Sequence, residues 1–273
     1  MNEYRLFPDI KLICGTEKTS AHSCIGITYC VDGIREYCID GRYFYLTAGS
    51  YIVLRNNDII SAESSGFNAV TIIIDHKKAP PHADDMLLDR TKLTDRLDRQ
   101  SRYIFAANDD ISRIFTDIRS HCRTYDTSML RIKTIEALML ISKDIDTLSN
   151  DNYGKIKHVG ELICNNISSH FTIPRLSDFF ELNPTTLKST FKQYHGCPVY
   201  AYAKNRKMFR AAELMSTSDM RIIDIAEEVG YCNASKFSSA FREVIGVNPK
   251  YYQMEHKKLR PQQSRFVSEN IAY

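Results

Sequence analysis

The sequence has no apolar run long enough to cross a membrane. Its apolar runs are short, such as residues 137–142 (ALMLIS), whereas a membrane-spanning helix needs roughly 18–20 apolar residues. The first residues (MNEYRLFPDIK) also lack the apolar segment of a secretory signal. We therefore expect a cytoplasmic protein that has no membrane partner.

A CxxC pair is also missing, although the chain contains 8 cysteines at irregular spacings. In a chain without an apolar leader, this pattern is typical of reduced thiols. Cys24, Cys30 and Cys38 lie on neighbouring predicted strands, where a metal or redox sensor is one interpretation. We prefer the simpler interpretation, that they are small buried apolar side chains, and we expect no cofactor.

A strong net charge is the third feature that the sequence lacks. With 36 basic and 33 acidic residues in a chain of 273, the formal net charge is only +3, which alone does not suggest a nucleic-acid partner. The average hides an asymmetry, because residues 1–150 carry 19 basic and 21 acidic side chains, whereas residues 151–273 carry 17 and 12. A positive excess in one half indicates that this half binds a polyanion.

The segment from about Ser23 to Asp75 has the pattern of an antiparallel β domain. Apolar residues alternate between 25 and 31, and turn pairs such as Asp32-Gly33 and Asp40-Gly41 separate short β-rich runs. Runs of this kind every 8–12 residues or so are typical of a sandwich or a barrel. Six aromatic residues of this segment are either the lining of a ligand pocket or, as we prefer, ordinary core: Tyr29, Tyr37, Tyr43, Phe44, Tyr45 and Tyr51.

Between residues 108 and 148 the apolar period changes to that of a helix. Ile111, Ile114, Phe115, Ile118 and Cys122 share one helical face. A second amphipathic helix is expected to begin near residue 127. The two helices either cover the sheet or form the seam of a dimer.

A polar run at residues 149–154 (SNDNYG) predicts a domain boundary. We therefore expect a β-rich domain with C-terminal helices over 1–150, a helical domain over 151–257 and a polar tail over 258–273. The predicted fold class is α+β.

The helical domain contains an internal repeat. Phe191 and Phe241 are 50 residues apart, as are Gly196 and Gly246. Each unit has an apolar helix, a tight turn and a polar helix with a Leu/Phe-x3-Phe stripe. This is the pattern of a helix-turn-helix, in which one helix packs and the next is presented outward. The two units are expected over about 173–194 and 222–243.

The outward faces of the two second helices are polar and contain no acidic residue. In a helix-turn-helix, such a face enters the major groove of DNA. The alternative is a helical scaffold whose polar faces are merely solvated. The candidate DNA-binding residues, each able to donate to a phosphate or a base edge, are Thr185, Thr186, Lys188, Ser189, Lys192, Ser235, Lys236, Ser238, Ser239 and Arg242.

Several spaced motifs make this pattern specific to one family. The second unit has Ile225-Ala226 five residues before Tyr231, then Phe237 and Phe241, then the segment 246–252 (GVNPKYY). In these motifs, and over about residues 155–253, the chain resembles the tandem helix-turn-helix domain of the AraC/XylS transcriptional regulators. The resemblance implies two recognition helices, joined by a linker helix over about 199–215, that read adjacent major grooves of double-stranded DNA.

The resemblance also implies functions for the N-terminal half. AraC-type regulators of this length commonly carry a cupin-like β-barrel, which senses a small-molecule effector or mediates homodimerisation. Activation, with RNA polymerase as a partner, is the common role in the family. A protein-interaction module without an effector is the alternative for this half.

The chain departs from the family pattern at three points. Ser189 and Ser239 stand where the family usually has arginine, the commonest bidentate partner of guanine. Glu181 replaces the usual turn glycine of the first unit, so that we expect a less regular turn there. Pro198 follows Gly196 one place early.

Cupin barrels also serve as enzyme scaffolds, so that a metal-dependent enzyme is a second hypothesis. Such a site needs two histidines and a carboxylate, typically beginning with His-x-His. Residues 1–75 contain only His22, and His76 and His82 flank the proline-rich segment that follows. We therefore expect a protein that is not an enzyme.

Overall fold

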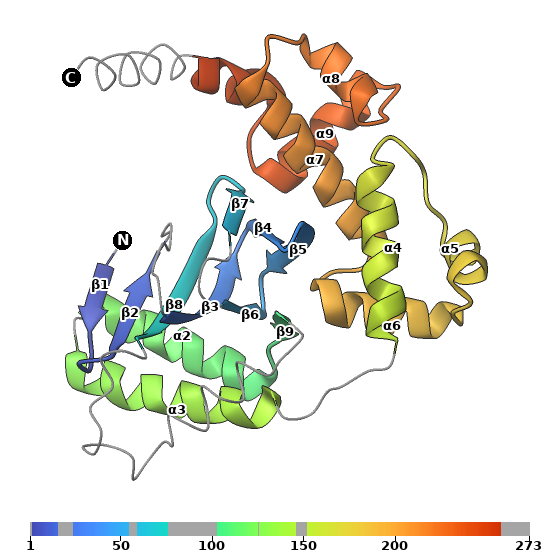
Figure 1. The fold of residues 1–273 in the computed structure, drawn as a ribbon. Helices are drawn as coiled ribbons and strands as arrows, with labels where there is room; N and C mark the ends of the chain where they lie inside the picture. The colour runs from blue at the N-terminus through green and yellow to red at the C-terminus, as the bar shows by residue number, and fades with distance from the viewer. Residues whose placement is uncertain are drawn as a thin grey trace, which may run out of the picture.

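The computed structural model describes residues 2–15, 24–54, 59–75, 103–124, 126–145 and 152–257 (Figure 1). The expected polar tail over 258–273 lies outside the described residues, as do His22, His76 and His82. The described chain begins with strands, continues through two long helices and ends in a set of helices. This order of elements is the mixed α and β composition that the sequence predicted.

The strands form two antiparallel sheets. One sheet has six strands in the order β1-β2-β8-β3-β6-β9, and the other has three in the order β5-β4-β7. The strands are β1 (Asn2–Arg5), β2 (Ile10–Cys14), β3 (Cys24–Asp32), β4 (Ile34–Ile39), β5 (Arg42–Thr47), β6 (Ser50–Leu54), β7 (Ile59–Glu63), β8 (Asn68–Asp75) and β9 (Ile104–Ala106). The antiparallel β domain is thus confirmed. Hydrogen bonds between the described strands do not close the sheets into a barrel, so that the cupin-like barrel stays a prediction.

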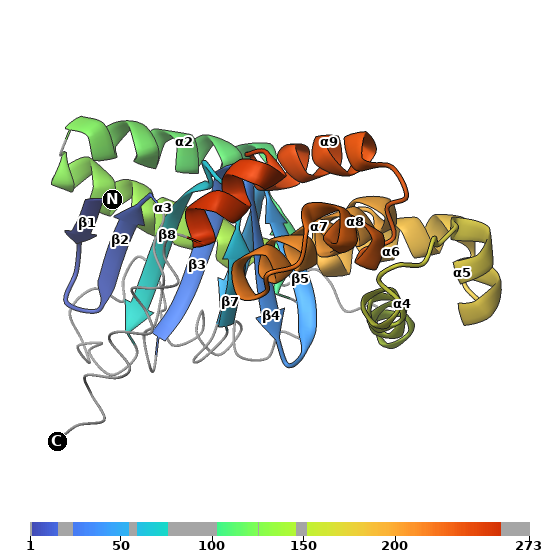
Figure 2. The same ribbon diagram turned by 90° about the horizontal axis from the view of Figure 1, so that it is seen from above.

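Two helices cover one face of the six-stranded sheet. They are α2 (Asp109–Thr124) and α3 (Thr127–Ile145) (Figure 1, Figure 2). The five apolar residues predicted to share one face of the first helix are all buried in a core that also contains Leu12, Ile27 and Val70 from the sheet. The ring of Phe115 stacks on that of Tyr29, with their centroids 4.7 Å apart. Of the two alternatives for these helices, covering the sheet is therefore confirmed.

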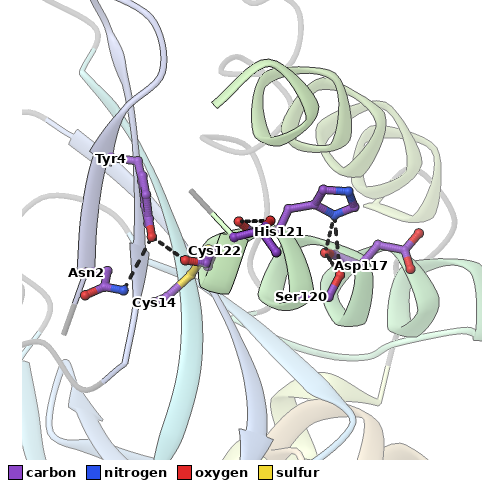
Figure 3. The surroundings of a disulfide bond; sticks show 8 residues. Asn2, Tyr4, Cys14, Asp117, Ser120, His121 and Cys122 are labelled. Carbon is purple, nitrogen blue, oxygen red and sulfur yellow. Dashed lines mark hydrogen bonds between the residues drawn. A yellow bond between two sulfur atoms is a disulfide. The ribbon is translucent and has the colours of Figure 1, made fainter. Parts of the chain in front are cut away.

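A disulfide between Cys14 and Cys122 joins β2 to α2 (Figure 3). The hydroxyl of Tyr4 on β1 donates a 2.6 Å hydrogen bond to the carbonyl oxygen of Cys122 beside it. The expectation that all eight cysteines are reduced thiols is therefore wrong for this pair. The two residues are 108 positions apart and meet only because α2 packs on the sheet, which their spacing in the sequence does not reveal.

The three cysteines considered as a sensor are not paired with one another. Cys30 is fully buried, and burial raises the pKa of its thiol to about 12, which keeps the sulfur protonated. Cys24 and Cys38 are partly exposed. Among the described residues, no group of three or more His, Cys, Asp or Glu side chains is placed to hold a metal ion. These facts support the interpretation of Cys30 as a small core residue.

The C-terminal part is entirely helical. Its helices are α4 (Tyr153–Asn165), α5 (Ile173–Phe180), α6 (Pro184–His195), α7 (Val199–Thr217), α8 (Ile222–Glu228) and α9 (Ala234–Ile245), followed by a helical segment over 249–257. No helix of the described residues is long and apolar enough to cross a membrane.

One continuous apolar core joins the helices to the smaller sheet. The ring centroid of Tyr45, on β5, lies 5.2 Å from that of Tyr202 and 5.9 Å from that of Phe209, both on α7. Phe44, the preceding residue, contacts the ring of Tyr194 at the end of α6. All these side chains are buried. Phe44 and Tyr45 thus fill the contact between the two parts of the chain. Of the six N-terminal aromatics predicted to be core, five are buried, namely Tyr29, Tyr37, Phe44, Tyr45 and Tyr51, whereas Tyr43 is half-buried.

A buried ion pair lies within this contact. Glu36 on β4 and Arg206 on α7 are only 3% and 8% exposed, and their charged groups are 3.5 Å apart. The hydroxyl of Tyr45 donates a 2.6 Å hydrogen bond to the Glu36 carboxylate. Arg206 donates to the hydroxyl of Tyr43 at 3.0 Å, with its guanidinium 3.8 Å from the centroid of that ring. Burial raises the pKa of Glu36 to about 7, since it outweighs the opposing effects of Arg206 and Tyr45.

The raised pKa of Glu36 predicts a pH-dependent stability. Folding favours the protonated form of Glu36. Its contribution to the free energy of unfolding is therefore fully present below its ordinary pKa of 4.5 and is lost as the pH rises through about 7. Glu36→Gln keeps the shape of the side chain but does not titrate. We expect the free energy of unfolding of the wild type, relative to this variant, to fall by roughly 3 kcal/mol across that range.

Urea unfolding of both proteins at a series of pH values measures this difference. His195, which is also buried with a pKa lowered by burial to about 4, is present in both proteins, so that its titration cancels. A difference that is constant or grows with pH would contradict the raised pKa.

Candidate DNA interface

The first helix-turn-helix unit consists of α5 and α6, and local capping residues determine where each helix begins. Pro174 lies in the first turn of α5. The side chain of Asn183 accepts a 2.9 Å hydrogen bond from the backbone N–H of Thr185, and Pro184 follows it as the first residue of α6. Gly196 ends α6 in the left-handed conformation, with φ at 84°.

The second unit, α8 and α9, has the same construction. Asn233 caps α9, because its side chain accepts a 2.9 Å hydrogen bond from the backbone N–H of Lys236. Gly246 ends the helix with φ at 91°. The predicted Leu/Phe-x3-Phe stripes are fully buried in both units, as Leu187 and Phe191 in α6 and as Phe237 and Phe241 in α9. The inner face of each second helix is therefore fixed by two large apolar side chains 4 residues apart.

The turns of the two units are equivalent. Glu181 adopts the left-handed conformation, with φ at 51°, as Gly230 does with φ at 82°. After Glu181, the N–H of Leu182 donates to the carbonyl of Ser177, and after Gly230 the N–H of Tyr231 donates to Ala226 in the same pattern. The expectation of a less regular first turn is therefore wrong, because the backbone hydrogen bonds impose the turn although residue 181 has a side chain.

The ten candidate residues lie on α6 and α9 as predicted, five on each helix. Eight of them are exposed, and Thr186 and Ser238 are half-buried at the edge of the packed face. They lie on the side of each helix that faces away from the buried stripe. α7 lies between the two helices, so that the two polar faces are held on one rigid set of helices (Figure 1).

The candidates differ in the hydrogen-bond donors that they have available for DNA. The Ser189 hydroxyl donates within α6, to the carbonyl oxygens of Thr185 at 2.9 Å and Thr186 at 3.2 Å. Its oxygen remains able to accept but its proton is engaged. Four of the ten candidates are basic, and none of the four forms a salt bridge with another described residue: Lys188, Lys192, Lys236 and Arg242. These four provide the strongest attraction for phosphate on the two faces.

A second group of basic residues, which the sequence pattern did not predict, lies beside α9. A cleft of about 410 Å³ lies between α7, the loop before α5 and the start of α9. Lys204 and Lys207 of α7 line it together with His170, Asn233 and Lys236. Lys204 is paired at 2.6 Å with Glu243, and Lys207 is largely buried, which lowers its pKa. The sequence signal for this group is the spacing of three residues between Lys204 and Lys207, which places both on one side of the linker helix.

The left-handed turn residues provide a test of the unit structure. Glu181→Gly should relieve a backbone strain of roughly 1–2 kcal/mol, of which the greater freedom of unfolded glycine offsets about 0.5–1 kcal/mol. The ion pair of Glu181 with Lys155, at 3.8 Å, involves a side chain that is 88% exposed and contributes little. We expect a net stabilisation of about 0.5–1 kcal/mol in urea unfolding.

Gly230→Ala is the matched control in the second unit. A Cβ atom there would collide with the backbone of Ser168, and φ is also positive, so that this variant should be destabilised. If Glu181→Gly also lowered the stability, the assignment of strain to residue 181 would be wrong.

Comparison with known proteins gives matches concentrated in the same helices. Residues 176–255 match the family model described as a helix-turn-helix domain. The regulator ExsA of Pseudomonas aeruginosa is 36% identical over 78 residues, which are 28% of this chain and 28% of ExsA. The arabinose operon regulatory protein of Salmonella typhimurium is 24% identical over 130 residues, 46% of each chain. The matches thus span less than half of the length of these relatives.

Two solved structures are also among the matches. The C-terminal domain of AraT, a response regulator from Geobacillus stearothermophilus, is 27% identical, with a TM-score of 0.37, and covers 39% of this chain and 88% of that one. ToxT from Vibrio cholerae is 14% identical, with a TM-score of 0.37, and covers 90% of this chain and 98% of that one. On the family model and the relatives above, the resemblance to the AraC/XylS transcriptional regulators is confirmed, and residues 176–255 match a helix-turn-helix domain.

Proposed function

We propose that the chain is a sequence-specific DNA-binding transcriptional regulator that reads adjacent major grooves with α6 and α9. The observation that carries the proposal is the repeated unit itself. Each unit has a capped second helix, a buried apolar stripe and an exposed polar face with two cations that form no salt bridge with another described residue. The one carboxylate on these two helices, Glu243 of α9, is paired with Lys204 of α7 at 2.6 Å. A helical scaffold with merely solvated faces would not require such an excess of basic over acidic residues on both helices.

Seven of the ten residues divide into two roles by their place on the helix. The N-terminal residues of a recognition helix contact base edges, which assigns Thr185, Thr186, Ser235, Lys236 and Ser238 to base contacts. Lys192 and Arg242 lie one to two turns further along, where they would contact phosphate groups. Ser189 and Ser239 cannot provide the bidentate guanine contact of arginine. Base preference therefore depends on the first turns of α6 and α9.

The N-terminal half, over residues 1–150, is the regulatory part of this proposal. We propose that it senses a small-molecule effector or mediates homodimerisation, on a cupin-like arrangement of its two sheets. The regulator would act in the cytoplasm as an activator that contacts RNA polymerase. The alternative of a pure protein-interaction module would be favoured by stable dimers that no metabolite stabilises. We propose no catalytic activity, since the relatives named above are regulators.

The direct test is selection of DNA from a random library by the full chain. The full chain is used because its helices share a core with the N-terminal sheet. We expect a defined motif with two conserved segments about one helical turn of DNA apart. A variant with Lys188, Lys192, Lys236 and Arg242 all changed to Gln serves as the control, which should bind DNA poorly. The absence of any sequence preference in the wild type would refute the proposal.

Substitution of Lys192 tests the phosphate role. Lys192→Ala should weaken binding to all sequences alike and should reduce the slope of log K against log salt concentration by about one. Binding of the selected DNA and of a scrambled duplex is measured over a range of salt concentrations. A changed base preference with an intact slope would show that Lys192 does not contact phosphate.

Substitution of Lys236 tests the base-reading role. Lys236→Ala should change the preference at one position of the selected motif, by about 1–3 kcal/mol, and should leave other positions unaffected. Ser238→Ala should behave in the same way at a neighbouring position. Binding to a set of single-base operator variants measures both. A uniform loss across the set would contradict the assignment.

A further inference from the structure

The N-terminal domain contacts the two helix-turn-helix units at the same point of the repeat. Gly196 and Gly246, which end α6 and α9, are the equivalent glycines 50 residues apart. A Cβ atom at Gly196 would lie 2.7 Å from the carbonyl oxygen of Tyr45, and one at Gly246 would lie 2.8 Å from that of Ser65. At both points the backbone of the N-terminal domain therefore approaches a helix end more closely than any residue with a side chain permits.

Hydrogen bonds accompany both approaches. The N–H of Ser65 donates a 2.6 Å bond to the carbonyl oxygen of Ile245, in the last turn of α9. At the end of α6, Nδ1 of His195 donates to the carbonyl oxygen of Tyr43 at 3.2 Å, and Arg42 donates to the hydroxyl of Tyr194 at 3.2 Å. The last carbonyl groups of a helix have no partner within it, so that the bond from Ser65 satisfies one that the helix leaves open.

The linker helix is held between these two points. The buried pair of Glu36 with Arg206 and the packing of Tyr45 on Tyr202 fix α7 on the same sheet. The N-terminal domain thus contacts the end of one recognition helix, the linker and the end of the other. A rigid body touching both ends sets the separation and the angle between the two recognition helices.

We propose that the N-terminal domain is a positioning element for DNA recognition, which holds α6 and α9 at a fixed separation and so determines the spacing of the two base-contacting segments in the operator. This inference rests on the proposed function. Successive major grooves are about 34–36 Å apart along DNA, and a helix pair of fixed geometry fits only one spacing of its two target segments. Release of one helix end would let the same side chains accept neighbouring spacings.

The contact at Ser65 allows a test that spares the core. Ser65 and Gly246 are both exposed, so that this contact adds little buried apolar surface. Ser65 occupies the second position of a tight turn, which is closed by the bond from the N–H of Phe67 to Ser64 and has Gly66 at positive φ in the third position. Proline suits the second position of such a turn. Ser65→Pro therefore keeps the turn and removes only the N–H that binds Ile245.

The experiment uses full-length wild type, Ser65→Pro and the control Ser65→Ala, which keeps the N–H. Binding is measured to the selected operator and to versions with one or two base pairs inserted or removed between the two segments. Wild type and Ser65→Ala should lose at least about tenfold in affinity per inserted base pair, as for a mismatched pair. Ser65→Pro should bind all spacings within a few-fold of one another, while its preference for bases within each segment is unchanged.

Three outcomes would overturn the inference while the proposed function stands. They are a wild type that binds its motif at all spacings, a Ser65→Pro variant that keeps the wild-type spacing profile, and a variant that loses base preference together with spacing preference. Loss of all sequence preference in the wild type would instead refute the proposed function. If Ser65→Pro does not fold, Arg42→Ala, which removes the 3.2 Å hydrogen bond to Tyr194 at the end of α6, is measured in the same way and should broaden the spacing profile.

Discussion

The contact of the small sheet with α6 and α7 is the constraint on which the rest of the molecule depends. Aromatic rings from β5, α6 and α7 fill it, and a buried carboxylate and guanidinium lie at its centre. Burying such a pair is costly, and here Tyr43 and Tyr45 supply additional hydrogen bonds, whereas Nε of Arg206 has no hydrogen-bond partner among the described residues. The domain that would sense a signal and the helices that would read DNA are therefore parts of one packed interior.

This arrangement gives a physical path from the N-terminal domain to DNA. A signal can act on DNA binding only if it favours one arrangement of the DNA-reading helices over another. In this chain, any movement of β4 or β5 changes the surroundings of Arg206 and of the ends of α6. The coupling needs no separate linker or hinge, because the sheet touches the helices directly.

The sequence was sufficient where local chemistry determines structure. The predicted units at 173–194 and 222–243 correspond closely to Ile173–His195 and Ile222–Ile245, because caps such as Asn183 and end glycines such as Gly196 act within a few residues. The exposed polar faces of α6 and α9 were predicted from the internal repeat and its buried Leu/Phe-x3-Phe stripes. The sequence did not predict contacts between distant segments, as for Cys14 with Cys122 and Glu36 with Arg206, because no local pattern indicates such pairs. Turn spacing likewise predicted the strands but not their division into a six-stranded and a three-stranded sheet.

The shared core also limits how the two parts of this chain could be exchanged with those of similar proteins. A chimaera that exchanged only the C-terminal helices would have to present, at the positions of Tyr194, Tyr202 and Phe209, side chains that fit Phe44 and Tyr45. Otherwise large aromatic surfaces on both halves would face water. The two parts of the chain are consequently not independent modules, and substitutions on β5 and α7 would have to change together for such an exchange to preserve the fold.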